Sequence, residues 1–82
     1  MTMKIPRVGD PVHYHSRGSA DGVFQPEARA AIITGIPEGQ NTYPYPRVHL
    51  AVLNPTGMFF DLDVPHAVEK RPGCWTWPPA RD

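Results

Sequence analysis

Proline and glycine interrupt this chain so often that a long helix has no room to form. Eleven prolines and seven glycines are spread through 82 residues, and the share of proline is about twice the usual one. Because proline breaks a helix and glycine weakens one, the intervals between them favour short extended segments. We therefore expect an all-β domain with helix as a minor element at most.

Five short runs rich in Val, Ile, Thr and aromatic residues lie between these breakers and are expected to form strands. The runs are Val8–His15, Ala28–Ile36, Arg47–Leu53, Met58–Val64 and Cys74–Trp77. The residues Asn54-Pro55-Thr56-Gly57 predict a tight hairpin turn between the third and fourth runs. Proline presets φ at the second position of such a turn, while Asn and Gly favour the first and fourth.

The order of strands and loops predicts an SH3-like barrel. Two long loops, at residues 16–27 and 37–46, separate the first three runs, and shorter turns follow. An OB-fold also has five strands, but it would need a helix between the third and fourth, where this chain has only a four-residue turn. We predict a single five-stranded SH3-like β-barrel domain over residues 1–82, with its core in about residues 6–78.

The alternation of side chains along a strand predicts which residues face the core. On the first, third and fourth runs, the residues expected to point inward are Val8, Val12, Tyr14, Val48, Leu50, Val52, Met58, Phe60, Leu62 and Val64. The second run has Ala30, Ile32 and Ile36 on one parity and Ala31 and Ile33 on the other, so it is expected to be covered on both faces. Asp61 and Asp63 are expected to face water.

A surplus of apolar residues on the outward parity suggests an interface. Trp75 and Trp77 share one parity, and the sequence leaves open whether they close the barrel or join this outer surface. In the second case the protein-interface residues are Trp75, Trp77, Phe59, Leu53 and Ile33. An apolar patch of roughly several hundred Å² marks an interface, and aromatic residues supply much of the binding energy. The hypothesis is that this face binds a protein partner or a second copy.

The tyrosines suggest a second candidate site. Tyr43 and Tyr45, together with Tyr14, could form an aromatic groove for proline-rich peptides or stacked nucleobases; alternatively, the prolines and tyrosines of residues 42–46 only stiffen an exposed loop. Nucleic-acid binding is disfavoured by the formal net charge of zero and by basic residues that are scattered among acids. Those basic residues are Arg17, Arg29, Arg47, Lys70 and Arg71.

Enzymatic and metal-dependent functions are not favoured. His13 and His15 point the same way on a strand and could bind a metal if His49, Asp61 or Cys74 supplied another ligand. Two histidines on the barrel exterior are the simpler interpretation. The carboxylates of Asp61 and Asp63 could do acid–base chemistry only in a cleft of low polarity, and nothing near Cys74 in sequence would lower its pKa. We predict no enzymatic activity, no metal and no cofactor.

Targeting signals are also missing from the sequence. The N-terminus lacks the apolar run of a signal peptide, no stretch is long and apolar enough to span a membrane, and Cys74 is the single cysteine. These features predict a cytoplasmic protein with no membrane partner.

Four segments carry a resemblance to known proteins: Val8–Tyr14, Ala30–Thr34, Leu50–Phe60 and Trp75–Pro78. Together they resemble a family of small uncharacterised proteins encoded by actinobacteria and their phages. The resemblance implies no catalytic residues. It implies a phage- or prophage-encoded accessory or structural protein, located in the host cytoplasm or associated with the virion. We therefore predict a non-enzymatic interaction or assembly module; the alternative is a nucleic-acid-binding small β-barrel.

Overall fold

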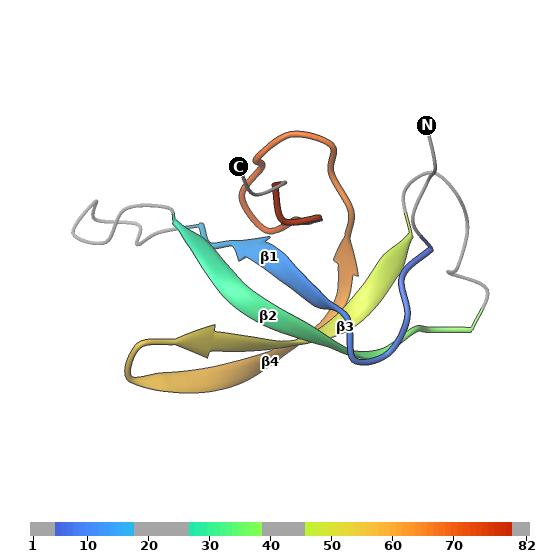
Figure 1. The fold of residues 1–82 in the computed structure, drawn as a ribbon, viewed down its shortest axis with the longest axis horizontal. Coiled ribbons are helices and arrows are strands. Elements are labelled where there is room, and N and C mark those ends of the chain that lie inside the picture. Colours follow the sequence, from blue (N-terminus) through green and yellow to red (C-terminus); the bar gives the residue numbers. More distant parts are fainter. Residues whose placement is uncertain (1–4, 18–26, 39–45, 80–82) are drawn as a thin grey trace.

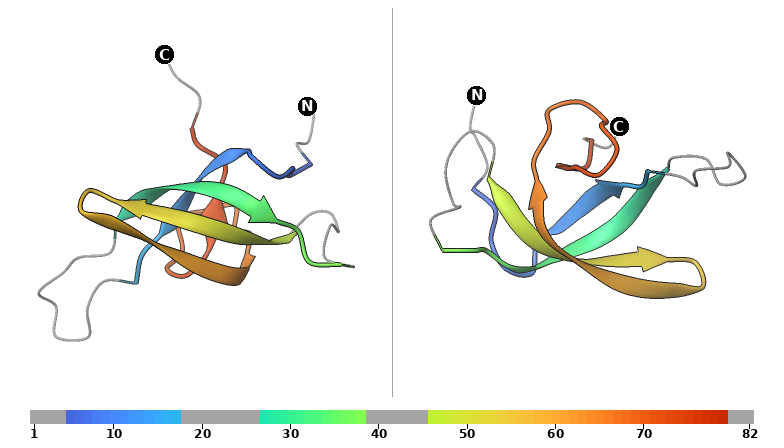
Figure 2. Two further views of the ribbon diagram at one scale, coloured as in Figure 1. Left: turned by 90° about the horizontal axis from the view of Figure 1, so that it is seen from below. Right: turned by 180° about the vertical axis from the view of Figure 1, so that it is seen from behind.

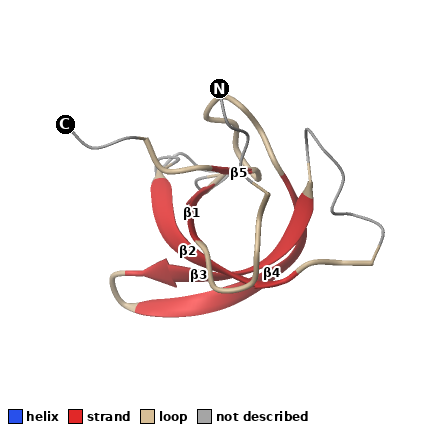
Figure 3. Ribbon diagram, turned by 45° about the vertical axis from the view of Figure 1, so that its right-hand side comes forward, coloured by secondary structure: helices blue, strands red, loops and turns tan. Residues whose placement is uncertain are grey.

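The computed structural model describes residues 5–17, 27–38 and 46–79, and their strands form one antiparallel sheet. The strands are β1 (Pro11–His15), β2 (Ala28–Gly35), β3 (Arg47–Asn54), β4 (Gly57–Pro65) and β5 (Trp75–Thr76). Their order in the sheet is β4-β3-β2-β1-β5. Figure 3 shows that no helix occurs in these ranges, so the all-β prediction is confirmed.

The sheet curls into a half-barrel that is compatible with the predicted SH3-like fold (Figure 1). The C-terminal segment, orange to red in Figure 1, folds across the concave side and places β5 beside β1. Seen from below, in the left panel of Figure 2, the convex side of β2, β3 and β4 faces the reader. The sheet therefore has an inner face, which the C-terminal segment closes, and an outer face.

The predicted hairpin turn is confirmed, whereas the first and last strands are shorter than expected. Asn54 pairs with Gly57 across the turn between β3 and β4. β1 begins at Pro11 because a turn precedes it, with Gly9 at a φ of 97° and the Asp10 amide donating to the Arg7 carbonyl at 3.0 Å. This turn leaves Val8 exposed, so its predicted inward position was wrong.

The core lies on the inner face and is centred on a tryptophan. Trp75 is fully buried, and its Nε1 donates a hydrogen bond to the carbonyl of Pro46 at 3.2 Å. Trp77 packs edge-on against it, with ring centroids 5.1 Å apart. Of the two orientations that the sequence left open, the structure shows the inward one. The other core residues are Val12, Tyr14, Ala31, Ile33, Val48, Leu50, Val52 and Val64.

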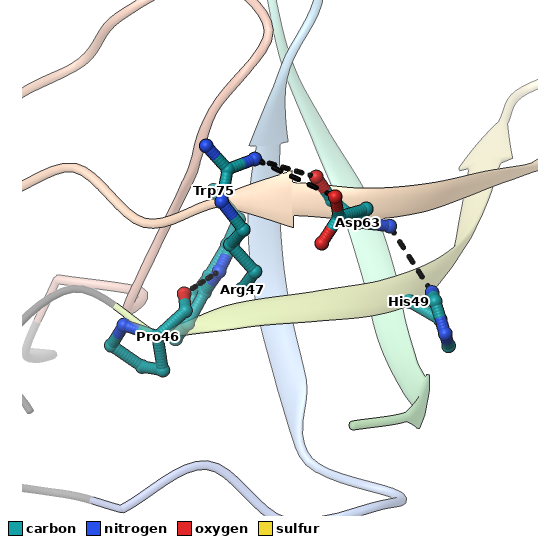
Figure 4. A network of polar contacts seen from close by, with 5 residues as sticks. All are labelled: Pro46, Arg47, His49, Asp63 and Trp75. Carbon is teal, nitrogen blue, oxygen red and sulfur yellow. Dashed lines mark hydrogen bonds and ion pairs between the residues drawn. The ribbon is translucent and has the colours of Figure 1, made fainter. Parts of the chain in front are cut away.

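Two irregularities flank His49 in the centre of the sheet. On β4, Leu62 and Asp63 together stand opposite His49, and Asp63 has a φ of 57°. The Asp63 amide donates to Nδ1 of His49 at 3.1 Å, as Figure 4 shows. On β2 the pairing shifts between Ile33 and Gly35, where a β-carbon would lie 3.1 Å from the His49 ring. Such bulges increase twist and bend a sheet, which accounts for the curl at this point.

The bulge on β4 reverses which side chains face the core. Val64 pairs with Val48 on the inner face, but beyond the bulge Asp61 pairs with Leu50 and Phe59 pairs with Val52. Met58, Phe60 and Leu62 therefore take the opposite parity and are exposed. Their predicted inward orientation was wrong, because the extra residue in the bulge shifts the alternation by one position and the prediction assumed an unbroken strand.

The two-sided burial predicted for β2 was also wrong. Ala31 and Ile33 are buried on the inner face, whereas Ala30 and Ile32 are exposed on the other. The surplus of apolar residues on β2 is therefore an uncovered surface in the part of the chain that the structure describes.

Candidate protein interface

Two rows of apolar side chains cross β2, β3 and β4 on the outer face. In the first row Ala30 pairs with Leu53, and Leu53 with Met58. In the second row Ile32 pairs with Ala51, and Ala51 with Phe60. Cross-strand partners on one face lie about 5 Å apart, so each row is continuous. None of these six residues is charged or polar.

The larger members of both rows are open to solvent. Phe60 is 68% exposed, Met58 62%, Leu53 39% and Ile32 38%. We call these four residues and the two alanines between them, Ala30 and Ala51, the outer patch. From the size of such side chains, the exposed apolar area is roughly 400 Å², which is in the range of the largest patches on monomers, and those patches are often functional.

The structure separates the five residues predicted to form an interface. Trp75 and Ile33 are fully buried, so they cannot be part of an exposed patch. Trp77 is half-buried against Trp75. Phe59 lies on the inner parity, where its ring meets that of Tyr14 edge-on at 6.0 Å. Leu53 is the one residue of the five that belongs to the outer patch.

Sequence reasoning missed Ile32, Met58 and Phe60 because it placed them in the core. One signal was available. Asp63 lies on the polar parity and leaves the alternation of β4 undisturbed, but Asp adopts the left-handed conformation of a bulge more readily than most residues. A bulge at Asp63 would have moved Met58 and Phe60 to the outer face.

The inner rim of the half-barrel carries a polar cluster. Burial, followed by the nearby carboxylate of Asp61, raises the pKa of Tyr14. The Arg17 guanidinium packs against Gly73, whose φ is 79°, so closely that a β-carbon there would collide with it. Asp61, Arg17 and Gly73 are among the residues that line a cleft of about 330 Å³.

Opposite charges are already matched in that cleft. Arg47 lies at the same cleft, and its Nη1 donates to the Asp63 carbonyl at 3.2 Å and lies 3.8 Å from the Asp63 carboxylate (Figure 4). Arg17 and Asp61 also both interact with Tyr14. Because two arginines and two aspartates line the cleft, its formal charges balance and leave no excess to attract an ionic ligand.

The histidines have structural partners. His15 is buried, and its Nε2 lies 2.8 Å from Oγ1 of Thr76. Burial lowers the pKa of His15, and the positive charges of His13 and Lys70 lower it further. His49 accepts the bulge hydrogen bond from Asp63. Within residues 5–17, 27–38 and 46–79, no three His, Cys, Asp or Glu side chains are gathered as a metal site.

The proposed aromatic groove cannot be assembled from the described residues. Tyr43 and Tyr45 lie outside them, and Tyr14 is buried in the core. The outer patch is thus the feature of the described chain that most resembles a binding surface.

The chain matches no family model, no curated protein and no solved structure. In the described ranges there is also no helix of the length and hydropathy needed to cross a membrane. The function must therefore be argued from the geometry of the outer patch.

Proposed function

We propose that this protein is a non-enzymatic interaction or assembly module that docks a protein surface on its outer patch. The observation that carries the proposal is the pair of uncharged apolar rows that cross β2, β3 and β4. The inner face already has a core around Trp75, so the outer rows are not needed to complete it. Apolar side chains gain about 25 cal/mol for each Å² that is removed from water, which favours a partner over solvent.

The charge distribution favours protein over nucleic acid as the partner. Arg29 lies 3.1 Å from the carboxylate of Glu27, and Arg47 is close to Asp63. The outer patch itself carries no cation, and the formal net charge of the chain is zero. Phosphate backbones are bound mainly through unpaired Lys and Arg, whereas apolar rows match the core of a protein interface.

The most concrete form of this proposal is a phage- or prophage-encoded accessory or structural protein. It would act in the cytoplasm of the host cell or as part of the virion. The resemblance to small proteins of actinobacteria and their phages supports this source.

The proposal is tested by placing one charge in the outer patch. Phe60→Asp should abolish assembly, whether with a second copy or with a protein that co-purifies and rebinds as a pure component, because the carboxylate would be buried without a partner. Val68→Asp is the matched control. Val68 is also an exposed apolar residue, at 75%, but it lies outside the outer patch.

The expected result is loss of every complex in Phe60→Asp and retention in Val68→Asp. If both variants assemble as the original chain does, the outer patch is not a docking surface. Circular dichroism of both variants verifies that each one is folded.

A further inference from the structure

We infer that the occupant of the outer patch is a second copy of this chain, packed face to face about a twofold axis. This inference rests on the proposed function and names its partner. A twofold dimer brings the same surface of both copies together, so that surface has to be complementary to itself.

The outer patch meets the electrostatic condition for self-association. Its six residues are uncharged, so a second copy brings no like charge against it. The formal net charge of the whole chain is zero, which removes long-range repulsion between copies as well. A partner that is recognised by charge would instead need ionic groups on this face.

The shape of the outer patch also suits a copy of itself. Ala51 lies between the larger Ile32 and Phe60 in one row, and the first row adds Leu53 and Met58 beside it. A small side chain between two large ones leaves a hollow in the surface. When a second copy is rotated by 180°, its large side chains can pack into this hollow. We place Phe60 of each copy over Ala51 of the other.

The outer patch supplies most of the area that a modest dimer needs. Stable interfaces bury about 800 Å² per partner, and an interface needs at least about 500 Å² per partner to be specific. The roughly 400 Å² of the outer patch would form the apolar centre, and a polar rim would supply the remainder. One polar residue of this rim is His13, which pairs with Ala30 on the outer face.

Packing through the face is favoured over pairing through the edge of the sheet. The edges of the sheet are β4 and the two-residue β5, so β4 is the strand that is long enough to pair with a copy of itself. The bulge at Asp63 and the proline at the end of β4 are features that prevent such pairing. Two antiparallel β4 strands would also leave Met58 and Phe60 in water, whereas packing of the faces buries them.

Sedimentation and light scattering on the purified chain test this inference. The expected mass at high concentration is twice 9.1 kDa, and it should persist at high salt because the contact is apolar. Phe60→Asp should raise the dimer dissociation constant on the order of 100-fold. Phe60→Leu should retain most of the dimer, and Val68→Asp should leave the constant unchanged.

Hydrogen exchange distinguishes the two dimer geometries. In a face-to-face dimer the free edge of β4 stays unpaired, so its outward amides exchange as fast in the dimer as in the monomer. Slower exchange of those amides on dimerisation would overturn the face-to-face arrangement, as would a dimer that Phe60→Asp does not weaken.

A chain that stays at 9.1 kDa at every concentration would also overturn this inference. The proposed function would survive that result if a purified partner protein bound the original chain and Val68→Asp but not Phe60→Asp. If Phe60→Asp affects neither kind of assembly, the proposed function fails together with the dimer.

Discussion

The two faces of the β2–β3–β4 sheet have nearly the same apolar composition and opposite environments. Ile33, Val52 and Leu50 on the inner face are fully buried, whereas Ile32, Leu53 and Phe60 on the outer face are exposed. The difference is that the C-terminal segment with Trp75 crosses the inner face. Hydrophobicity alone therefore does not define the core. The core forms on the face that the C-terminal segment covers, and the other face stays exposed.

The bulge opposite His49 determines which side chains of β4 belong to each face. It places Val64 in the core, puts Phe59 and Asp61 on the inner parity, and puts Phe60 on the outer face. The predictions below test whether the inner face carries the folding energy while the outer face is dispensable for it. Stability is to be measured in dilute solution, so that dimerisation does not contribute.

The largest expected difference lies between two aromatic residues. Trp75→Ala should lower the free energy of unfolding by about 3–5 kcal/mol, since it empties the centre of the core and removes the hydrogen bond to Pro46. Phe60→Ala should change it by less than about 0.5 kcal/mol. Urea unfolding followed by circular dichroism measures both; similar losses in the two variants would contradict the assignment of faces.

Two adjacent isoleucines provide a closer test. Ile33→Ala should cost about 2–5 kcal/mol, because Ile33 is fully buried. Ile32→Ala, one residue earlier and 38% exposed, should cost less than about 1 kcal/mol. The midpoints of thermal unfolding should rank the variants in this order. The reverse ranking would mean that β2 presents its other face to the core.

The bulge can be tested at the residue that adopts the unusual backbone conformation. Asp63→Val should destabilise the fold by about 1–2 kcal/mol, because a β-branched residue tolerates a positive φ poorly. Asp63→Gly should stay within about 1 kcal/mol of the original, because glycine accepts that φ and the exposed ion pair with Arg47 is weak. Equal losses of stability in the two variants would show that the fold depends on the side chain of Asp63 and not on its backbone conformation.

The smallest expected effect is on pH dependence, and it arises where the inner face is closed. Burial lowers the pKa of His66, which packs against Trp75, and of His15, which bonds to Thr76. Below the ordinary pKa of 6.5 the unfolded chain takes up protons that the folded histidines do not. Stability should therefore be full above pH 6.5 and decline as the pH falls through it.

Unfolding curves between about pH 7.5 and about pH 6 measure this decline while most carboxylates remain ionised. The double variant His15→Gln and His66→Gln should have a flatter dependence on pH than the original chain. An equally steep decline in the double variant would assign it to other groups.

The sequence predicts the strands of this protein better than it predicts their faces. Proline and glycine spacing marked all five strands and the turn at Asn54–Gly57, because these residues act locally on the backbone. Alternation succeeded on β3, where Val48, Leu50 and Val52 are all buried. It failed on β4, because the bulge depends on pairing with His49, which is distant in the sequence.

The sequence predicted an exposed apolar surface but not most of the residues that form it. The surplus of apolar residues predicted an exposed apolar face. Leu53 is exposed on that face, whereas Trp75 and Ile33 are buried in the core. Whether a given face is covered depends on the path of residues 66–79, which closes one side of the sheet. No local pattern encodes that path.

Hydroxyl-radical footprinting of the dilute monomer tests most directly whether the bulge sends Met58 and Phe60 outward. Met58, Phe60 and Leu62 should be labelled strongly, while Val64 and Trp75, both buried, should be protected. Protection of Phe60 and Leu62 to the same degree as Val64 would mean that alternation runs unbroken along β4. In that case the outer patch would not exist.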